Sequence, residues 1–174
     1  LSVRALEEII DYQEYPVEAA KKSTLARRSL GIGYIGLAHY LAKNKVKYDD
    51  KKAWKLVDEI TEAFQYYLLK ASNTLAKERG ACEYFNKTKY SDGILPIDSY
   101  KKDVDDIVKR KLSYDWTSLR NDIKSSGLRH STLSAQMPSE SSSVVSNATN
   151  GVEPPRDFLS IKKSKKGTLK QIVP

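Results

Sequence analysis

The sequence predicts an α/β protein that is rich in helix. Apolar residues recur every three or four positions in several segments, and the longest of these, residues 50–79, is followed by Gly80. This spacing is typical of amphipathic helices, which often end at a glycine. Short strand-like runs occur at residues 30–36, 133–137 and 158–173. Helices that alternate with short strands favour an α/β fold.

The composition is that of a soluble globular protein. The chain has 174 residues, of which 40% are hydrophobic, enough for one ordinary core. Its net charge is +8, but 22 acidic residues are interspersed with 30 basic ones, so nucleic-acid binding is the weaker interpretation. The single cysteine, Cys82, excludes an internal disulfide and a cysteine-cluster metal site.

The apolar runs are too short to span a bilayer, and no signal-peptide pattern is present. We therefore expect a cytoplasmic protein with no membrane partner. The chain begins at Leu1 without a methionine and ends directly after a strand-like run, so we also expect it to be a piece of something longer.

Two helices and a glycine-rich segment are expected first. Helical spacing predicts a helix over residues 2–15, which Pro16 ends, and another over 17–27. Residues 30–36 have the GxGxxG spacing of a dinucleotide-binding loop, but basic and hydroxyl residues precede them where that motif needs an apolar strand. We interpret these glycines as part of a buried strand and turn.

The long helix is predicted to have one continuous apolar face. Its members are Trp54, Val57, Ile60, Phe64, Tyr67, Leu68, Ala71 and Leu75. Tyr66 and Tyr67 are interpreted as packing residues. Cys82 has no histidine nearby to activate it, so we expect a small buried hydrophobic side chain rather than a reactive thiol.

Two aspartates are predicted to cap the helices that follow. Asp98 precedes a segment expected to turn four apolar side chains inward: Tyr100, Val104, Ile107 and Val108. Asp115 precedes a helix with Trp116, Leu119 and Ile123 on one face and Gly127 just past its end. The aspartates at 103, 105 and 106 alternate with bases as on a solvated surface, and His39 and His130 are expected to be structural, so no metal site is predicted.

The segment around Pro138 is predicted to be a strand, a turn and the start of a helix. Pro138 ends the strand, Ser139 stands at the N-cap position, and Ser142 and Ser143 lie in the first turn. Unpaired N–H groups and several hydroxyls at one place suit a phosphate. Plain capping by serine is the competing interpretation, and spacing alone favours it.

The C-terminal part is predicted to form a β-hairpin. Residues 147–151 indicate a turn and 153–156 an extended link. Residues 158–161 and 168–173 alternate as strands do, around a basic tip at Lys162–Lys166 that is more typical of a solvated turn than of a nucleic-acid contact. The sequence shows no internal repeat and no convincing domain boundary.

Several separated blocks resemble one enzyme family. They lie at residues 27–33, 65–73, 93–98, 116–119, 127–130, 134–138 and 146–156. Together they resemble the large, catalytic subunit of class I ribonucleotide reductases, in its bacterial and phage branch. The resemblance covers the whole chain, residues 1–174, and implies part of a ten-stranded α/β barrel.

The resemblance also implies a role for the Pro138 segment. In the family, the residues that match Pro138, Ser139, Glu140, Ser141 and Ser142 hold the substrate diphosphate, and Met137 beside them is expected to line the substrate pocket. The enzyme reduces ribonucleoside diphosphates by thiyl-radical chemistry, with catalytic cysteines on other segments. No catalytic residue, metal or cofactor is therefore expected here, and the isolated chain should be inactive.

The implied partners are those of the complete enzyme. They are a ribonucleoside diphosphate, the remaining segments of the large subunit, a radical-generating small subunit, and thioredoxin or glutaredoxin as reductant. The alternative from another class is an autonomous basic module that binds nucleic acid through residues 162–166. Protection of the Ser139–Ser142 amides by diphosphate favours the enzyme, and salt-sensitive binding to arbitrary DNA favours the module.

Overall fold

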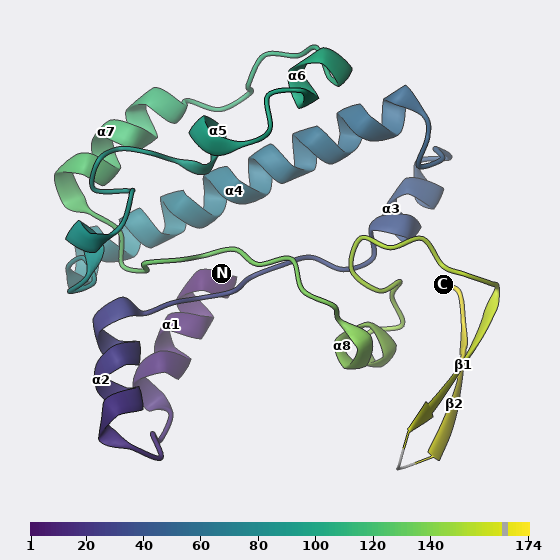
Figure 1. Ribbon diagram of the computed structural model, residues 1–174, viewed down its shortest axis with the longest axis horizontal. Coiled ribbons are helices and arrows are strands. Elements are labelled where there is room, and N and C mark those ends of the chain that lie inside the picture. The colour runs from purple at the N-terminus through teal and green to yellow at the C-terminus, as the bar shows by residue number, and fades with distance from the viewer. Residues whose placement is uncertain (165–166) are drawn as a thin grey trace. The chain divides into compact units, whose positions relative to one another are not determined.

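The computed structural model describes residues 1–164 and 167–174 (Figure 1). Helices dominate the described chain, which has one two-stranded sheet. The elements are α1 (Ser2–Tyr12), α2 (Glu18–Arg27), α3 (Leu37–Lys43), α4 (Lys51–Arg79), the 3-10 helix η1 (Phe85–Lys87), α5 (Pro96–Ser99), α6 (Val104–Ile107), α7 (Trp116–Ser126), α8 (Glu140–Val145), β1 (Leu159–Ser164) and β2 (Gly167–Ile172). The prediction of a helix-rich protein is confirmed.

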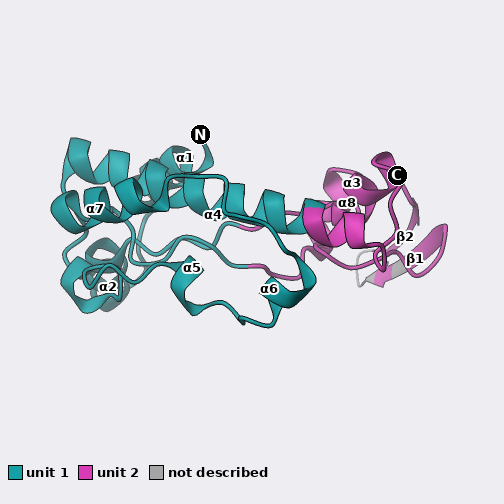
Figure 2. Ribbon diagram, turned by 90° about the horizontal axis from the view of Figure 1, so that it is seen from above, with its two compact units in different colours: residues 1–32, 56–135 teal, residues 33–55, 136–174 magenta. Residues whose placement is uncertain are grey.

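The chain forms two compact units, coloured separately in Figure 2. Unit 1 contains residues 1–32 and 56–135, and unit 2 contains residues 33–55 and 136–174. Each unit is thus assembled from two separated stretches of chain. A discontinuous unit has no single boundary along the sequence, and this explains why none was visible there.

Unit 1 is organised around α4 and α7. Its buried apolar cluster consists of Val3, Leu68, Leu69, Leu75, Leu95, Trp116, Leu119, Ile123, Leu128 and Leu133. The side chain of Asn73 on α4 donates to the carbonyl oxygens of Asp122 (3.2 Å) and Gly127 (2.9 Å), so polar bonds join α4 to the end of α7. The predicted burial of Cys82 is confirmed, since it is 4% exposed.

The start of α7 follows the prediction closely. Asp115 Oδ1 accepts a hydrogen bond from the Ser118 N–H (2.9 Å), and Asp115 Oδ2 accepts one from the Ser118 hydroxyl (2.6 Å). The helix ends at Gly127, whose φ of 75° suits a residue without Cβ, because a Cβ there would lie 2.6 Å from that of Ala81. The start of α7 is therefore fixed by local sequence, and its end by the glycine backbone together with the close approach of Ala81.

The prediction that a helix after Asp98 turns its apolar side chains inward is wrong. Asp98 does accept from the Leu95 N–H (2.7 Å) and pairs with Arg120, but α5 and α6 are four residues each. Tyr100, Val104 and Ile107 are exposed.

The apolar face of α4 also differs at its edges from the prediction, because Trp54 and Tyr67 are exposed, whereas Tyr66 packs against the core. The periodicity identified the apolar residues, but it did not show which of them pack against other apolar side chains.

Two extended segments of unit 1 run parallel where strands were predicted. Ile32 N–H donates to Leu133 O (2.9 Å), and Ala135 N–H donates to Ile32 O (3.1 Å), which makes one parallel bridge between Ile32 and Ser134. The segment 31–36 is exposed or half-buried rather than buried as predicted. The ten-stranded barrel is not confirmed, because the described residues contain this single bridge and one hairpin.

Unit 2 contains α3, α8 and the hairpin. The strands β1 and β2 pair antiparallel, with Leu159 opposite Ile172, which confirms the predicted hairpin. The centre of its predicted basic tip, residues 165 and 166, lies outside the described residues. Among the described helices, none is both long and apolar enough to cross a membrane.

Candidate functional site

Ser139 lies at the N-cap position of α8, as predicted, but its side chain does not cap the helix. Instead the Ser139 N–H and hydroxyl both donate to Oδ1 of Asn150, each at 2.8 Å. The N–H of Gly151 in turn donates to the Ser139 hydroxyl oxygen (2.9 Å). The turn at 147–151 thus holds Ser139 in place, and the Ser139 hydroxyl is fully engaged.

The other serines of the segment differ in what their hydroxyls do. Ser143 is buried, and its hydroxyl donates to the Glu140 carbonyl (3.1 Å). The Ser142 hydroxyl makes a long bond of 3.4 Å to the Ser139 carbonyl. Ser141 and Glu140 are exposed, as is Pro138 before them. Of the serines at 139–143, only Ser141 and Ser142 are therefore exposed.

The backbone of the same residues offers further donors. Ser143 N–H is the first to donate within this turn, to Ser139 O at 2.9 Å. The N–H groups of Glu140, Ser141 and Ser142 precede it and have no acceptor four residues earlier in the helix. We call residues 138–143 the Ser139 loop. The structure gathers all the predicted phosphate-binding residues into it.

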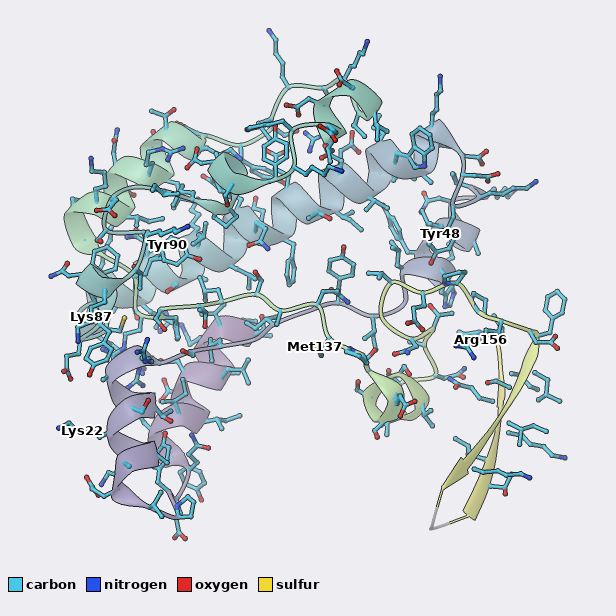
Figure 3. The ribbon with its side chains drawn as sticks, in the orientation of Figure 1. Lys22, Tyr48, Lys87, Tyr90, Met137 and Arg156 are labelled. Carbon is cyan, nitrogen blue, oxygen red and sulfur yellow. The ribbon has the colours of Figure 1, made fainter. Side chains whose placement is uncertain are left out.

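Met137 leads into the Ser139 loop from an extended segment (Figure 3). It is 39% exposed. Beside it, the Gln136 side-chain amide donates to Tyr34 O (2.7 Å), and Tyr34 N–H donates to Gln136 Oε1 (3.4 Å). This side chain continues the parallel pairing in the manner of a backbone group.

A pocket of ≈ 290 Å³ opens beside the Ser139 loop. Its charged lining residues are Glu140, Glu153, Arg156 and Asp157. Three carboxylates against one guanidinium give a net negative lining, which disfavours a diphosphate. Thr149 also lines it, and its buried hydroxyl has no hydrogen-bond partner in the described part of the chain.

A second polar cluster, which the sequence did not reveal, lies in unit 1. Glu7 is fully buried and pairs with Arg28 (2.8 Å), Arg129 (2.6 Å) and Nε2 of His130 (3.0 Å). Ser72 hydroxyl lies 2.8 Å from His130 Nδ1. We call Glu7, Arg28, Arg129 and His130 the Glu7 cluster. Its signal in the sequence was a carboxylate four residues after Val3 and three before Ile10, on the buried face of α1.

The Glu7 cluster has shifted proton affinities. Burial acts to raise the pKa of Glu7, but hydrogen bonds from Arg28 and Arg129 outweigh it and hold that pKa below its usual value. Burial lowers the pKa of His130 to about 4, although Glu7 acts in the opposite direction. His130 is therefore neutral at pH 7. With the carboxylate at Nε2, the neutral ring carries its proton there and accepts at Nδ1 from Ser72.

Neither a metal centre nor an activated thiol was predicted for this chain. Among the described residues, no group of three or more histidine, cysteine or acidic side chains is arranged to hold a metal ion. Burial raises the pKa of the Cys82 thiol, so the thiolate is disfavoured.

Comparison with known proteins gives the same family over the whole chain. The family described as "Ribonucleotide reductase, barrel domain" matches residues 1–174. Ribonucleoside-diphosphate reductase subunit alpha of Haemophilus influenzae is 64% identical over 99% of this chain and 23% of its own length. The corresponding subunit 1 alpha of Escherichia coli K12 is 61% identical over 95% of this chain and 22% of its own length.

The chain is also similar to a relative from a phage. Ribonucleoside-diphosphate reductase subunit alpha of Enterobacteria phage T4 is 51% identical over 100% of this chain and 23% of its own length. The chain thus spans less than a quarter of each of these relatives. Its resemblance to the bacterial and phage branch is confirmed, and the chain belongs to the ribonucleotide reductase family, within the barrel domain of the alpha subunit.

Proposed function

We propose that this chain is part of a class I ribonucleotide reductase large subunit and holds the diphosphate of its substrate. The observation that carries the proposal is the family match over all residues 1–174, together with the accessible donors of the Ser139 loop. The proposed reaction replaces the 2′-hydroxyl of a ribonucleoside diphosphate by hydrogen and releases water. A pair of cysteine thiols becomes a disulfide and supplies the two electrons.

The radical chemistry is assigned to segments outside these 174 residues. The reaction needs several cysteines, whereas the chain contains only Cys82, whose thiol is buried and whose raised pKa disfavours the nucleophilic thiolate. The proposed partners are the remaining segments of the large subunit, a small subunit that generates the radical, and thioredoxin or glutaredoxin. We propose that the isolated chain is inactive.

The contribution of this chain is proposed to be electrostatic and positional. The N–H groups of Glu140, Ser141 and Ser142, with the hydroxyls of Ser141 and Ser142, would donate to phosphate oxygens. Ser139 would not donate directly, because Asn150 accepts from both its N–H and its hydroxyl. Pro138 fixes the backbone before the loop, and exposed Met137 is proposed to contact the nucleoside part.

Parallel pairing of the two extended segments supports a place in a barrel wall. One parallel bridge, between Ile32 and Ser134, leaves strand edges that further strands can extend. We propose that the remaining segments of the subunit supply those strands, and that the Ser139 loop follows directly from the barrel strand at residues 133–137.

The test is the double variant Ser141→Ala/Ser142→Ala in the complete large subunit. Each lost hydroxyl bond to a charged phosphate costs roughly 1.5–3 kcal/mol, so the loss of both should raise KM for CDP about a hundredfold or more. The phosphate is remote from the reacting carbon, so kcat should change little. The matched control is Ser125→Ala, at an exposed serine of α7. An unchanged KM in the double variant would remove the loop from the substrate site.

A further inference from the structure

We propose that Asn150 is the positioning residue of the Ser139 loop, which it holds in the conformation that receives a diphosphate. The inference rests on the proposed function of that loop. Asn150 lies outside the loop and is separated from Ser139 by 11 positions in the sequence. It acts on the substrate only through Ser139.

The first step is the geometry of the contact. Asn150 Oδ1 accepts from two donors of one residue, the Ser139 N–H and the Ser139 hydroxyl, each at 2.8 Å. Ser139 is 7% exposed, so water competes weakly for these groups. Because both donors meet one oxygen, the side chain and backbone of Ser139 are fixed together.

The second step is the anchoring of Asn150 itself. Its neighbour Gly151 donates its N–H back to the Ser139 hydroxyl oxygen (2.9 Å), which closes the network. The carbonyl of Thr149 accepts from the Gly36 N–H (3.0 Å), and the Ala148 N–H donates to Ser143 O (2.8 Å). The turn is therefore held from both sides, and Asn150 has a fixed place from which to act.

The third step is the effect on the accessible donors. Ser139 O accepts from Ser143 N–H (2.9 Å), so the conformation of Ser139 sets the direction of the turn that contains Glu140, Ser141 and Ser142. The turn therefore determines the direction of the N–H groups of these three residues. By satisfying the Ser139 N–H and hydroxyl internally, Asn150 also leaves the following amides as the accessible donors.

Without Asn150, two donors of a buried serine lose their acceptor. The Ser139 N–H and hydroxyl would then bond to other acceptors, and the loop would sample conformations in which the amides of 140–142 lose their present arrangement. Diphosphate binding would then be weakened by the free energy needed to reorder the loop. Once the substrate is bound, the geometry at the sugar would be unchanged.

The experiment measures CDP reduction by the complete large subunit with its small subunit and a dithiol reductant. Asn150→Ala should raise KM for CDP about tenfold or more and leave kcat within about twofold. Val145→Ala is the matched control, because it truncates a side chain of α8 itself that is 88% exposed. Its KM should stay within about threefold of the parent value.

Ser139→Ala is the second variant and keeps the proposal open to refutation if Asn150→Ala does not fold. It deletes the hydroxyl that joins Asn150 to Gly151 but keeps the N–H bond to Asn150. KM should rise by a smaller factor than in Asn150→Ala, about threefold or more, again at nearly constant kcat. An unchanged KM in Ser139→Ala would overturn the proposal.

The outcomes separate this inference from the proposed function. If Ser141→Ala/Ser142→Ala raises KM and Asn150→Ala does not, the loop binds the diphosphate and the positioning role of Asn150 is refuted. If neither variant changes KM, both proposals fail. A fall in kcat in proportion to the rise in KM would assign Asn150 a general structural role and would also overturn the inference.

Discussion

The Glu7 cluster and the Ser139 loop are both polar networks, but they differ in charge and in completeness. In unit 1 a buried carboxylate faces two guanidinium groups and a neutral imidazole, and its oxygens are fully used. In unit 2 the Ser139 network is built from backbone, hydroxyl and amide groups, with the Glu153 carboxylate at its edge, where it accepts from the Asn150 amide (3.4 Å), and N–H groups without an intrahelical acceptor follow Ser139. The difference agrees with our proposal that the Glu7 cluster stabilises the fold and that the Ser139 loop receives the diphosphate.

The N-termini of α7 and α8 differ in a related way, because one is capped by a side chain and the other is not. Asp115 caps α7 with two bonds to Ser118, so a side chain already satisfies an N–H group at that helix start. Ser139 at the start of α8 is turned toward Asn150 instead, and the N–H groups that follow it are left without a cap. We propose that the uncapped start of α8, and not the capped start of α7, accepts a phosphate.

The largest effect is expected for Glu7→Gln in the complete large subunit. The substitution leaves Arg28 and Arg129 without their shared buried counter-charge, and breaking such a pair typically costs about 3–5 kcal/mol of unfolding free energy. Urea denaturation measures the change. The neighbouring Glu8→Gln, which removes a surface pair with Arg79, should cost about 0–1 kcal/mol. Equal costs for the two variants would show that the cluster is not structural.

Stability should also depend on pH through His130. The unfolded residue takes up a proton near 6.5 and the folded one at about 4, so between these values the unfolded state binds more protons. The unfolding free energy should therefore fall as the pH falls from about 6.5 to about 4, by up to about 3 kcal/mol. The lowered pKa of Glu7 acts in the same direction at the acid end.

Replacement of the imidazole checks this pH dependence. In His130→Asn, the free energy of unfolding should vary less between pH 4 and pH 6.5 than in the parent protein, because the titrating group is gone. Thermal unfolding of the complete subunit across this range provides the measurement. A variant with the same pH dependence as the parent would assign the acid sensitivity to other groups.

Local features of this fold were predictable, and features that join distant segments were not. Asp115 and Gly127 were identified because a cap and a C-terminal glycine act within one helix. Ile32 and Ser134 are far apart in the sequence, so local patterns predicted the two extended segments but not that they pair with each other. Exposed Tyr100, Val104 and Ile107 were misassigned to a core because periodicity records apolar character and not contact.

The candidate site shows the same limit. Ser139 was placed correctly at the start of a helix from Pro138 and the hydroxyls alone. Its bond to Asn150 was not predictable, because the turn that returns Asn150 to the loop is set by contacts of Thr149 and Ala148. Sequence patterns therefore predicted the helix start, and the structure shows that the Ser139 hydroxyl is engaged within the fold while Ser141 is exposed.

A smaller effect is expected for Asp115→Ala, which makes the start of α7 resemble that of α8. Loss of an N-cap side chain lowers the free energy of unfolding, here by less than in Glu7→Gln, and KM for CDP should not change because no substrate contact is lost. Asp103→Ala, at an exposed aspartate, is the matched control and should lie within about 0.5 kcal/mol of the parent protein. A raised KM in Asp115→Ala would contradict the division between stabilising and ligand-binding networks.

The most direct measurement of the central claim is amide hydrogen exchange across residues 138–143 of the complete large subunit. CDP and cytidine are compared at the same concentration, so that the diphosphate is the difference between them. If the Ser139 loop holds the diphosphate, the amides of Glu140, Ser141 and Ser142 gain protection with CDP and not with cytidine, while those around Asp115 and Ser118 exchange as before. Equal exchange of the three loop amides with CDP, with cytidine and without ligand would contradict the account.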